Sequence, residues 1–226
     1  KIYRLTYNAE RYMSMIVFPM VFGMVVLAEP ATFILLSGWM PAIPILQILP
    51  FFALLAALEA PYQSQFVGTN RPHLARNRVV IMVASNVFLN FVLIPNDIQS
   101  LGLNLFGLGA KGAAIATVVS YMFGLIYSRI MAWKISGVKG NWKVGLHAIA
   151  SVIMGVSIYV LLYYFDLILW ITRWYQLLSF SLIGLGIYII ILYILKEFRR
   201  DDFNFFMDAL NIKKMMRYIW YEIRGK

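Results

Sequence analysis

The sequence lacks cysteine altogether and is poor in acidic residues. Among its 226 residues there is no Cys, and only ten Asp and Glu stand against twenty Lys and Arg. The absence of Cys excludes disulfide bonds and thiolate metal ligands, although it says little about the compartment. Charged residues make up 13% of the chain and hydrophobic residues 62%. This composition excludes an ordinary soluble domain.

Motifs typical of enzymes are also missing. The sequence has no Gly-rich phosphate-binding loop, no nucleophile elbow and no pair of carboxylates that would face a cleft. The two histidines, His73 and His147, have no Asp, Glu or Cys near them at the spacing of metal ligands. We therefore expect a protein that is not an enzyme and that holds neither a metal nor a cofactor.

What the sequence does contain is six long apolar runs. A helix of about 20 apolar residues crosses the ~30 Å hydrocarbon core of a bilayer. The expected spans are residues 12–36, 43–66, 79–94, 112–132, 144–164 and 174–195. The third run is the shortest and ends at Pro95. The predicted fold class is therefore an all-α integral membrane protein with six transmembrane helices.

The positive charges alternate along the chain between the two sides of these spans. Eighteen Lys and Arg would fall on one side, namely Lys1, Arg4, Arg11, Arg71, Arg76, Arg78, Arg129, Lys134, Lys139, Lys143, Lys196, Arg199, Arg200, Lys213, Lys214, Arg217, Arg224 and Lys226. The other side holds only Lys111 and Arg173. Because cytoplasmic loops retain basic residues, this bias predicts a multi-pass protein of the cytoplasmic membrane with both ends in the cytoplasm. The net charge of +10 then suits anionic lipid headgroups, and we expect no nucleic-acid partner.

Three parts are predicted along the chain. Residues 1–11 would form a cytoplasmic linker, residues 12–195 the six-helix transmembrane lobe, and residues 196–226 a basic cytoplasmic tail. Apolar residues in the tail recur on one helical face opposite Lys and Arg, which predicts an amphipathic helix lying in the membrane interface. Because the chain begins with Lys1 rather than Met, we expect it to be a piece of a longer protein.

Four polar residues inside the spans are candidates for a substrate cavity: Glu59, Gln63, Asn86 and Asn90. Glu59 and Gln63 are four residues apart, as are Asn86 and Asn90, so each pair shares a helix face. Glu59 could hold a cation, a proton or a sugar hydroxyl, or it could lie near the cytoplasmic end and reach water. The two asparagines could bind sugar or diphosphate groups, or they could only join helices.

Two further sets of residues suggest contacts. The arginines that could meet the diphosphate of a lipid-linked sugar are Arg11, Arg71, Arg76 and Arg78, although the charge bias alone also accounts for them. A ridge of small residues recurs every fourth position in the fourth run, at Gly112, Ala116, Ser120, Gly124 and Ser128. Small residues let helix backbones approach closely, so the ridge predicts a packed face.

Three stretches carry a family resemblance. They are residues 29–38 followed by 46–49, residues 89–95, and residues 109–117 running into Ser120 and Tyr121. In this order they resemble the C-terminal half of polysaccharide-biosynthesis (Wzx-like) flippases, which share a superfamily with MATE drug exporters and lipid II flippases. The resemblance covers roughly the first 130 residues. The loop at 96–111 departs from it, because the family commonly has a very short turn there.

The resemblance implies an architecture and an activity. The chain would be one lobe of a two-lobe MATE-like transporter, with an N-terminal six-helix lobe, covalent or separate, as its partner. It would move a polyprenyl-diphosphate- or dolichyl-phosphate-linked oligosaccharide across the membrane by alternating access, with possible coupling to a proton or sodium gradient. Two alternatives stay open: a MATE-like cation or drug antiporter lobe, and a non-catalytic scaffold subunit or integral enzyme of envelope glycan assembly.

Overall fold

The computed structural model describes residues 2–36, 38–98, 103–198 and 202. The chain forms two compact units, residues 1–188 and residues 189–226. The second unit contains the end of α8, which stops at Ile194. The predicted interfacial helix of the tail lies almost wholly outside the described residues. All packing described below belongs to the first unit.

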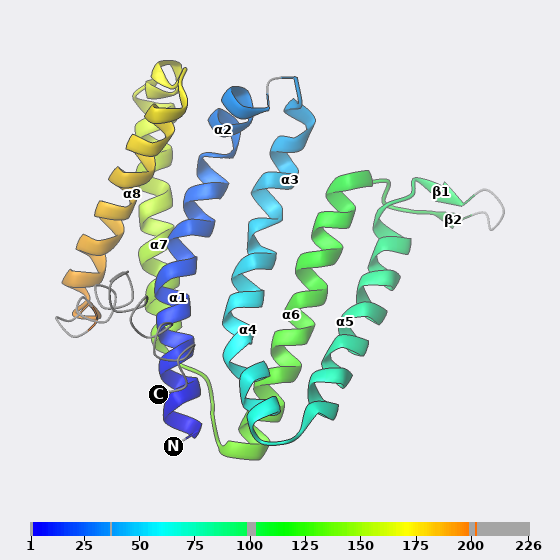
Figure 1. The fold of residues 1–226 in the computed structure, drawn as a ribbon. Helices are drawn as coiled ribbons and strands as arrows, with labels where there is room; N and C mark the ends of the chain where they lie inside the picture. Colours follow the sequence, from blue (N-terminus) through cyan, green and yellow to red (C-terminus); the bar gives the residue numbers. More distant parts are fainter. Residues whose placement is uncertain (1, 37, 99–102, 199–201, 203–226) are drawn as a thin grey trace, which may run out of the picture. The chain divides into compact units, whose positions relative to one another are not determined.

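Helices make up nearly all of the described chain (Figure 1). The α-helices are α1 (Ile2–Val26), α2 (Ala28–Leu35), α3 (Ile43–Ile48), α4 (Pro50–Gly68), α5 (Pro72–Leu93), α6 (Gly109–Ser136), α7 (Lys143–Tyr159) and α8 (Trp174–Ile194). Short 3-10 turns occupy Met40–Ala42 and Leu167–Trp170, and a π-turn at Val160–Tyr164 extends α7. Strands β1 (Asp97–Ile98) and β2 (Leu103–Asn104) pair antiparallel between α5 and α6.

The described residues contain six helical segments that are long and apolar enough to cross a membrane. They are Ile2–Val26, Met40–Gly68, Pro72–Leu93, Gly109–Ser136, Lys143–Tyr164 and Trp174–Ile194. This confirms the expectation of six candidate spans in an all-helical chain of the multi-pass type. The side of the membrane on which each end lies stays a prediction.

Two of these segments begin seven or more residues earlier than expected, at Ile2 rather than 12 and at Pro72 rather than 79. The predicted linker at residues 2–11 is the first part of α1, and α5 begins at Pro72 rather than at residue 79. The charges of Arg76 and Arg78 favour a loop before residue 79, but charge does not prevent a helix from forming. Pro72 lies in the first turn of α5, where its missing N–H costs no hydrogen bond and its fixed φ suits the helix.

Prolines account for the breaks within two of the apolar runs. Pro30 has no N–H to bond the carbonyl of Val26, four residues earlier, and α1 ends at Val26. In the second run, Pro50 begins α4 directly after the break at Leu49. Leu49 itself keeps helical φ and ψ of -62° and -31°, but Pro50 has no N–H to bond the carbonyl of Leu46, so the helical hydrogen bonding is interrupted there.

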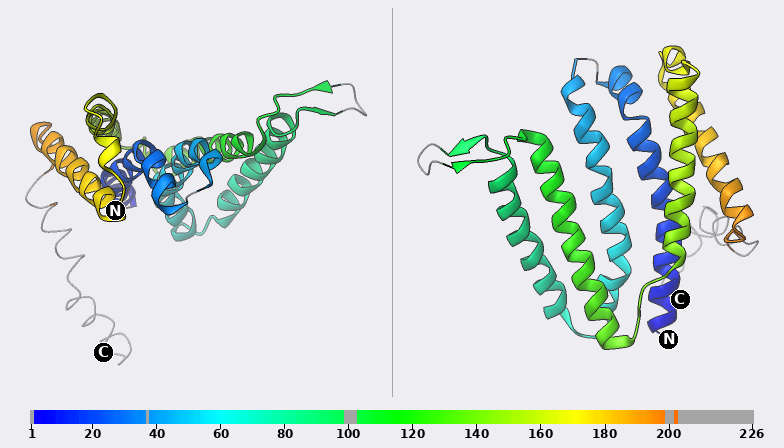
Figure 2. Two further views of the ribbon diagram at one scale, coloured as in Figure 1. Left: turned by 90° about the horizontal axis from the view of Figure 1, so that it is seen from above. Right: turned by 180° about the vertical axis from the view of Figure 1, so that it is seen from behind.

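Within the first unit the helices are neighbours in an order that differs from the sequence. Helix α5 packs on α6, α6 on α4, α4 on α1, and α1 on α7, as the views in Figures 1 and 2 also show. The apolar core lies among α1, α4 and α6. Its largest members are Phe18, Tyr62, Phe66 and Leu125, joined by Val138 from the connector after α6. Among the described residues of α5, by contrast, only Leu74 and Met82 are buried.

Candidate functional site

Two carboxylates are buried between the helices of the first unit. The exposed fraction of Glu59 on α4 is 1%, and that of Glu10 on α1 is 0%. Burying an ionised carboxylate is strongly unfavourable unless the charge is paired and hydrogen-bonded. Each of these two has such partners, and each pairs with an arginine from another helix.

Glu59 is held by three donors. The guanidinium of Arg78 on α5 forms an ion pair with its Oε2 atom. Gln63 Nε2, one turn further along α4, and Ser128 Oγ on α6 each donate a hydrogen bond of 2.8 Å to Oε1. Glu59 therefore joins α4, α5 and α6, and it faces protein rather than acyl chains or bulk water.

Glu10 is bound in a comparable way by the next residue of α6, Arg129. The guanidinium of Arg129 forms an ion pair with its Oε1 atom, and the backbone N–H of Asn141 donates to Oε2 at 2.8 Å. A Cβ at Gly140 would lie 3.6 Å from both Tyr62 Oη and Arg129 Cζ, and 3.7 Å from Glu10 Oε2. The connector after α6 therefore turns closely over this pair, and Gly140 adopts a positive φ of 86° there.

Both buried carboxylates are bound by consecutive residues of α6, Glu59 by Ser128 and Glu10 by Arg129. We call this set the α6 polar cluster: Glu10, Glu59, Gln63, Arg78, Ser128 and Arg129. In each pair the carboxylate is buried and the arginine is less so, since the side chain of Arg78 is 15% exposed and that of Arg129 is 37% exposed. In each ion pair the arginine is therefore the member that an anion outside the pair can reach.

The two asparagines lie further along α5 and also face α6. Asn86 Nδ2 donates to Ser120 Oγ at 3.4 Å, and Asn90 Nδ2 donates to Asn86 Oδ1 at 2.9 Å. Both side chains are half-buried. The structure therefore brings all four predicted cavity residues onto the faces that α4 and α5 turn towards α6, but as two groups with different partners.

All five small residues of the predicted ridge are buried. A Cβ at Gly112 would lie 2.7 Å from the carbonyl oxygen of Leu93, and one at Gly124 would lie 2.7 Å from Met82 Sδ. The ridge is thus the surface by which α6 approaches α5. Ser120 and Ser128 supply its hydrogen-bonding groups.

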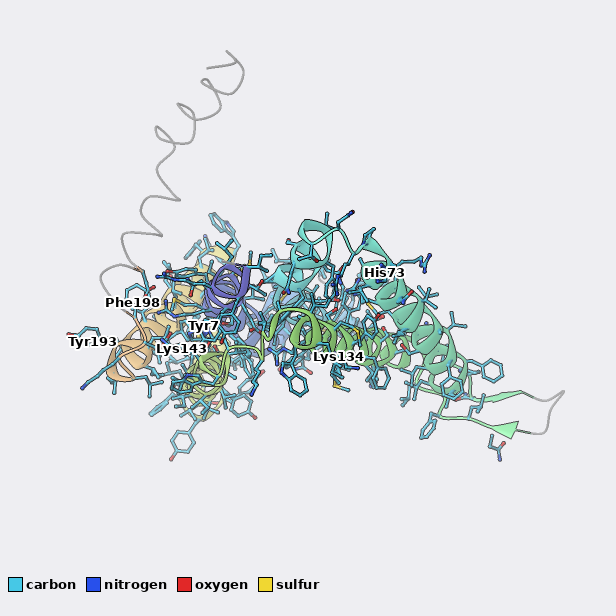
Figure 3. The ribbon with its side chains drawn as sticks, turned by 90° about the horizontal axis from the view of Figure 1, so that it is seen from below. Tyr7, His73, Lys134, Lys143, Tyr193 and Phe198 are labelled. Carbon is cyan, nitrogen blue, oxygen red and sulfur yellow. The ribbon has the colours of Figure 1, made fainter. Side chains whose placement is uncertain are left out.

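The four arginines predicted to contact a headgroup occupy different environments. Arg71 and Arg76 are exposed, and Arg11 is half-buried with its guanidinium 5.4 Å from the centre of the Tyr12 ring. Arg78 is the exception, because it reaches inward to Glu59. Figure 3 views the molecule from below and labels His73 of α5 and Lys134 of α6, both of which are exposed.

Sequence reasoning missed Glu10 and its partners. Glu10 lies beside Arg11 in a polar stretch, a pattern typical of an exposed surface, and no local signal pointed to Asn141. It also left His147 without a role; its Nδ1 lies 2.7 Å from Ser14 Oγ, between α7 and α1. Among the described residues, no group of three or more His, Cys, Asp or Glu could hold a metal ion.

Comparison with known proteins adds no relative. No family model matches the sequence, and neither curated proteins nor solved structures give a significant match.

Proposed function

We propose that the protein is one lobe of a flippase that moves a lipid-linked oligosaccharide across the cytoplasmic membrane by alternating access. Its substrate would carry a polyprenyl diphosphate or dolichyl phosphate, and its partners would be membrane lipids and a second six-helix lobe. Support comes from six apolar helices, from the bias of the basic residues, and from the three sequence stretches at 29–49, 89–95 and 109–121.

The observation that carries the proposal is the ion-paired Arg78 within the α6 polar cluster. An ionised side chain inside a membrane segment is unfavourable and typically marks a substrate or ion pathway. The planar fork of an arginine matches the oxygens of a phosphate, which makes Arg78 suited to the charged head of such a lipid. Its side chain keeps 15% of its surface exposed, so it is not sealed away from that head.

The remaining roles follow from position. Glu59, Gln63, Asn86 and Asn90 would lie along the route of the sugar–diphosphate head, and the exposed Arg71 and Arg76 would attract it from the cytoplasm. Both chain ends would be cytoplasmic. The alternative of a cation or drug antiporter receives less support, because Arg78 already neutralises the carboxylate that a cation would need.

A direct test is translocation by the purified full-length protein in vesicles. The probe is undecaprenyl diphosphate linked to N-acetylglucosamine that carries a dithionite-sensitive fluorophore, with a dolichyl-phosphate-linked sugar as a second arm. Flipping makes label in the inner leaflet accessible to dithionite added outside. A quenched fraction no greater than in protein-free vesicles, for both probes, would reject the flippase and leave the scaffold alternative.

A further inference from the structure

We propose that Arg78 exchanges its partner Glu59 for the diphosphate of the substrate, and that Glu59 takes up one proton as Arg78 leaves. Headgroup binding and proton uptake would then be linked at one ion pair. This inference rests on the proposed function, because it takes the diphosphate as the second partner of Arg78. It goes further by naming the coupling ion and the group that carries it.

The geometry of the pair favours movement of Arg78 and not of Glu59. Glu59 is 1% exposed and fixed by hydrogen bonds from Gln63 and Ser128, whereas Arg78 is 15% exposed. The Arg78 guanidinium also lies 5.4 Å from the centre of the Tyr121 ring, and within the part of the chain that the structure describes its Nε has no hydrogen-bond partner. Arg78 can therefore turn towards an anion outside the pair, while Glu59 stays where it is.

Glu59 would be left as a buried charge by this movement. Its two remaining partners, Gln63 and Ser128, are neutral donors and do not balance a full negative charge. Removing one member of a buried ion pair is strongly destabilising for that reason. Binding one proton from water restores neutrality: an O–H bond forms on Oε2, and no other bond changes. The same proton leaves when Arg78 returns.

Neighbouring charged groups do not supply the missing positive charge. Arg129 follows Ser128 on α6, but it is paired with Glu10 of α1. Tyr62 on α4 lies beside that second pair, and Tyr121 on α6 offers Arg78 a ring face. The Arg129–Glu10 pair is neutral as a unit, so Arg78 is the cation that compensates Glu59.

The surroundings of Glu59 favour a proton over a sodium ion. Hard metal cations need several oxygen ligands at once. Among the described residues, the only oxygen that hydrogen-bonds the Glu59 carboxylate is Ser128 Oγ, since Arg78 and Gln63 present nitrogen donors. A proton requires a single carboxylate oxygen. The site as built can therefore neutralise itself with a proton without gathering new ligands.

The test counts protons during binding. Purified full-length protein in detergent is titrated with inorganic pyrophosphate, and separately with undecaprenyl diphosphate, by calorimetry in buffers of different ionisation enthalpy. Glu59→Gln, which keeps a polar group for Gln63 and Ser128, is measured at the same pH, so the protons of the ligand itself cancel. The expected difference is one additional proton taken up by the unchanged protein. Glu29→Gln, at an exposed carboxylate, should leave that proton count unchanged.

A second readout is infrared spectroscopy. Binding of pyrophosphate should produce the C=O stretching band of a protonated carboxyl group in the unchanged protein, and Glu59→Gln should lack that band. Arg78→Gln should weaken pyrophosphate binding at least tenfold, whereas Arg4→Gln, at an exposed arginine, should bind normally. Far-ultraviolet circular dichroism and gel filtration establish that each variant is folded; if Arg78→Gln is not, Glu59→Gln decides alone.

Three results would overturn the inference: equal proton counts for the unchanged protein and Glu59→Gln, affinity that depends on sodium with no proton uptake, or no binding of either diphosphate. Failure here is distinguishable from failure of the proposed function. Translocation in vesicles with equal proton counts would reject only the coupling at Glu59. If neither translocation nor diphosphate binding were observed, the flippase itself would be rejected.

Discussion

Ser128 and Arg129 are consecutive residues of α6, yet they bind two different carboxylates on two different helices. Ser128 donates to Glu59 of α4, and Arg129 pairs with Glu10 of α1. Adjacent residues point about 100° apart around a helix, so α6 serves both partners at one level. The contacts of Ser128 and Arg129 therefore connect the polar groups of α1, α4, α5 and α6 into one cluster.

The first prediction concerns the Arg78–Glu59 pair. Arg78→Leu should lower the free energy of unfolding by about 3 kcal/mol, the lower end of the range for breaking a buried pair, because Arg78 keeps some exposure. The double variant Glu59→Leu/Arg78→Leu should regain most of that loss, since no uncompensated charge remains. Thermal unfolding of the detergent-solubilised protein measures both. A double variant less stable than Arg78→Leu alone would contradict the ion-pair account.

The second prediction concerns the close approach of α6 to α5. Gly112→Ala places a Cβ 2.7 Å from the backbone oxygen of Leu93, which cannot move aside as a side chain can. We expect a loss of about 1–3 kcal/mol, the usual effect of overpacking. The control is Gly145→Ala on α7, where no atom lies within 4 Å of the new Cβ. Equal stability of the two variants would show that α6 and α5 are not packed in this way.

The third prediction concerns the connector between α6 and α7. Glu10→Ala removes the acceptor of both Arg129 and the Asn141 N–H. We expect faster amide hydrogen exchange at residues 137–142 and a stability loss of about 2 kcal/mol, less than for a fully buried pair because Arg129 is 37% exposed.

Its matched control is Glu29→Ala, because Glu29 is exposed and accepts one hydrogen bond from Tyr163 Oη. Exchange at residues 137–142 should not change in that variant. If both variants loosened the connector equally, the effect could not be assigned to the Glu10 contacts.

The fourth prediction concerns orientation in the membrane. These 226 residues contain no Cys, so they contribute no thiol other than the single cysteine introduced into them. Trp39→Cys should react with a membrane-impermeant maleimide added to intact cells, whereas Lys139→Cys should react only after permeabilisation. Both parent residues are exposed, so accessibility to the reagent on its own side is not limiting. The opposite pattern would reverse the orientation inferred from the basic residues.

Sequence reasoning was reliable where one helix determines the outcome. Length and hydropathy gave six candidate spans, because the hydrocarbon core sets a minimum apolar length whatever the neighbours are. Sequence reasoning placed the starts of α1 and α5 too late in the chain, because the early turns of these helices contain charged residues such as Glu10 and Arg78. A hydropathy pattern cannot show that a charge is paired inside the protein.

The sequence alone determined that Glu59 and Gln63 share a face of α4, and that small residues line one face of α6, because helix periodicity sets both. Only the tertiary structure decided that Arg78 and Ser128 meet Glu59, and that Glu10 meets Arg129, 119 positions away. Contacts between distant helices depend on which faces pack together. Which faces pack together depends on how closely the backbones can approach and on how buried charges are neutralised. Both depend on several helices at once, so neither can be inferred from a single segment.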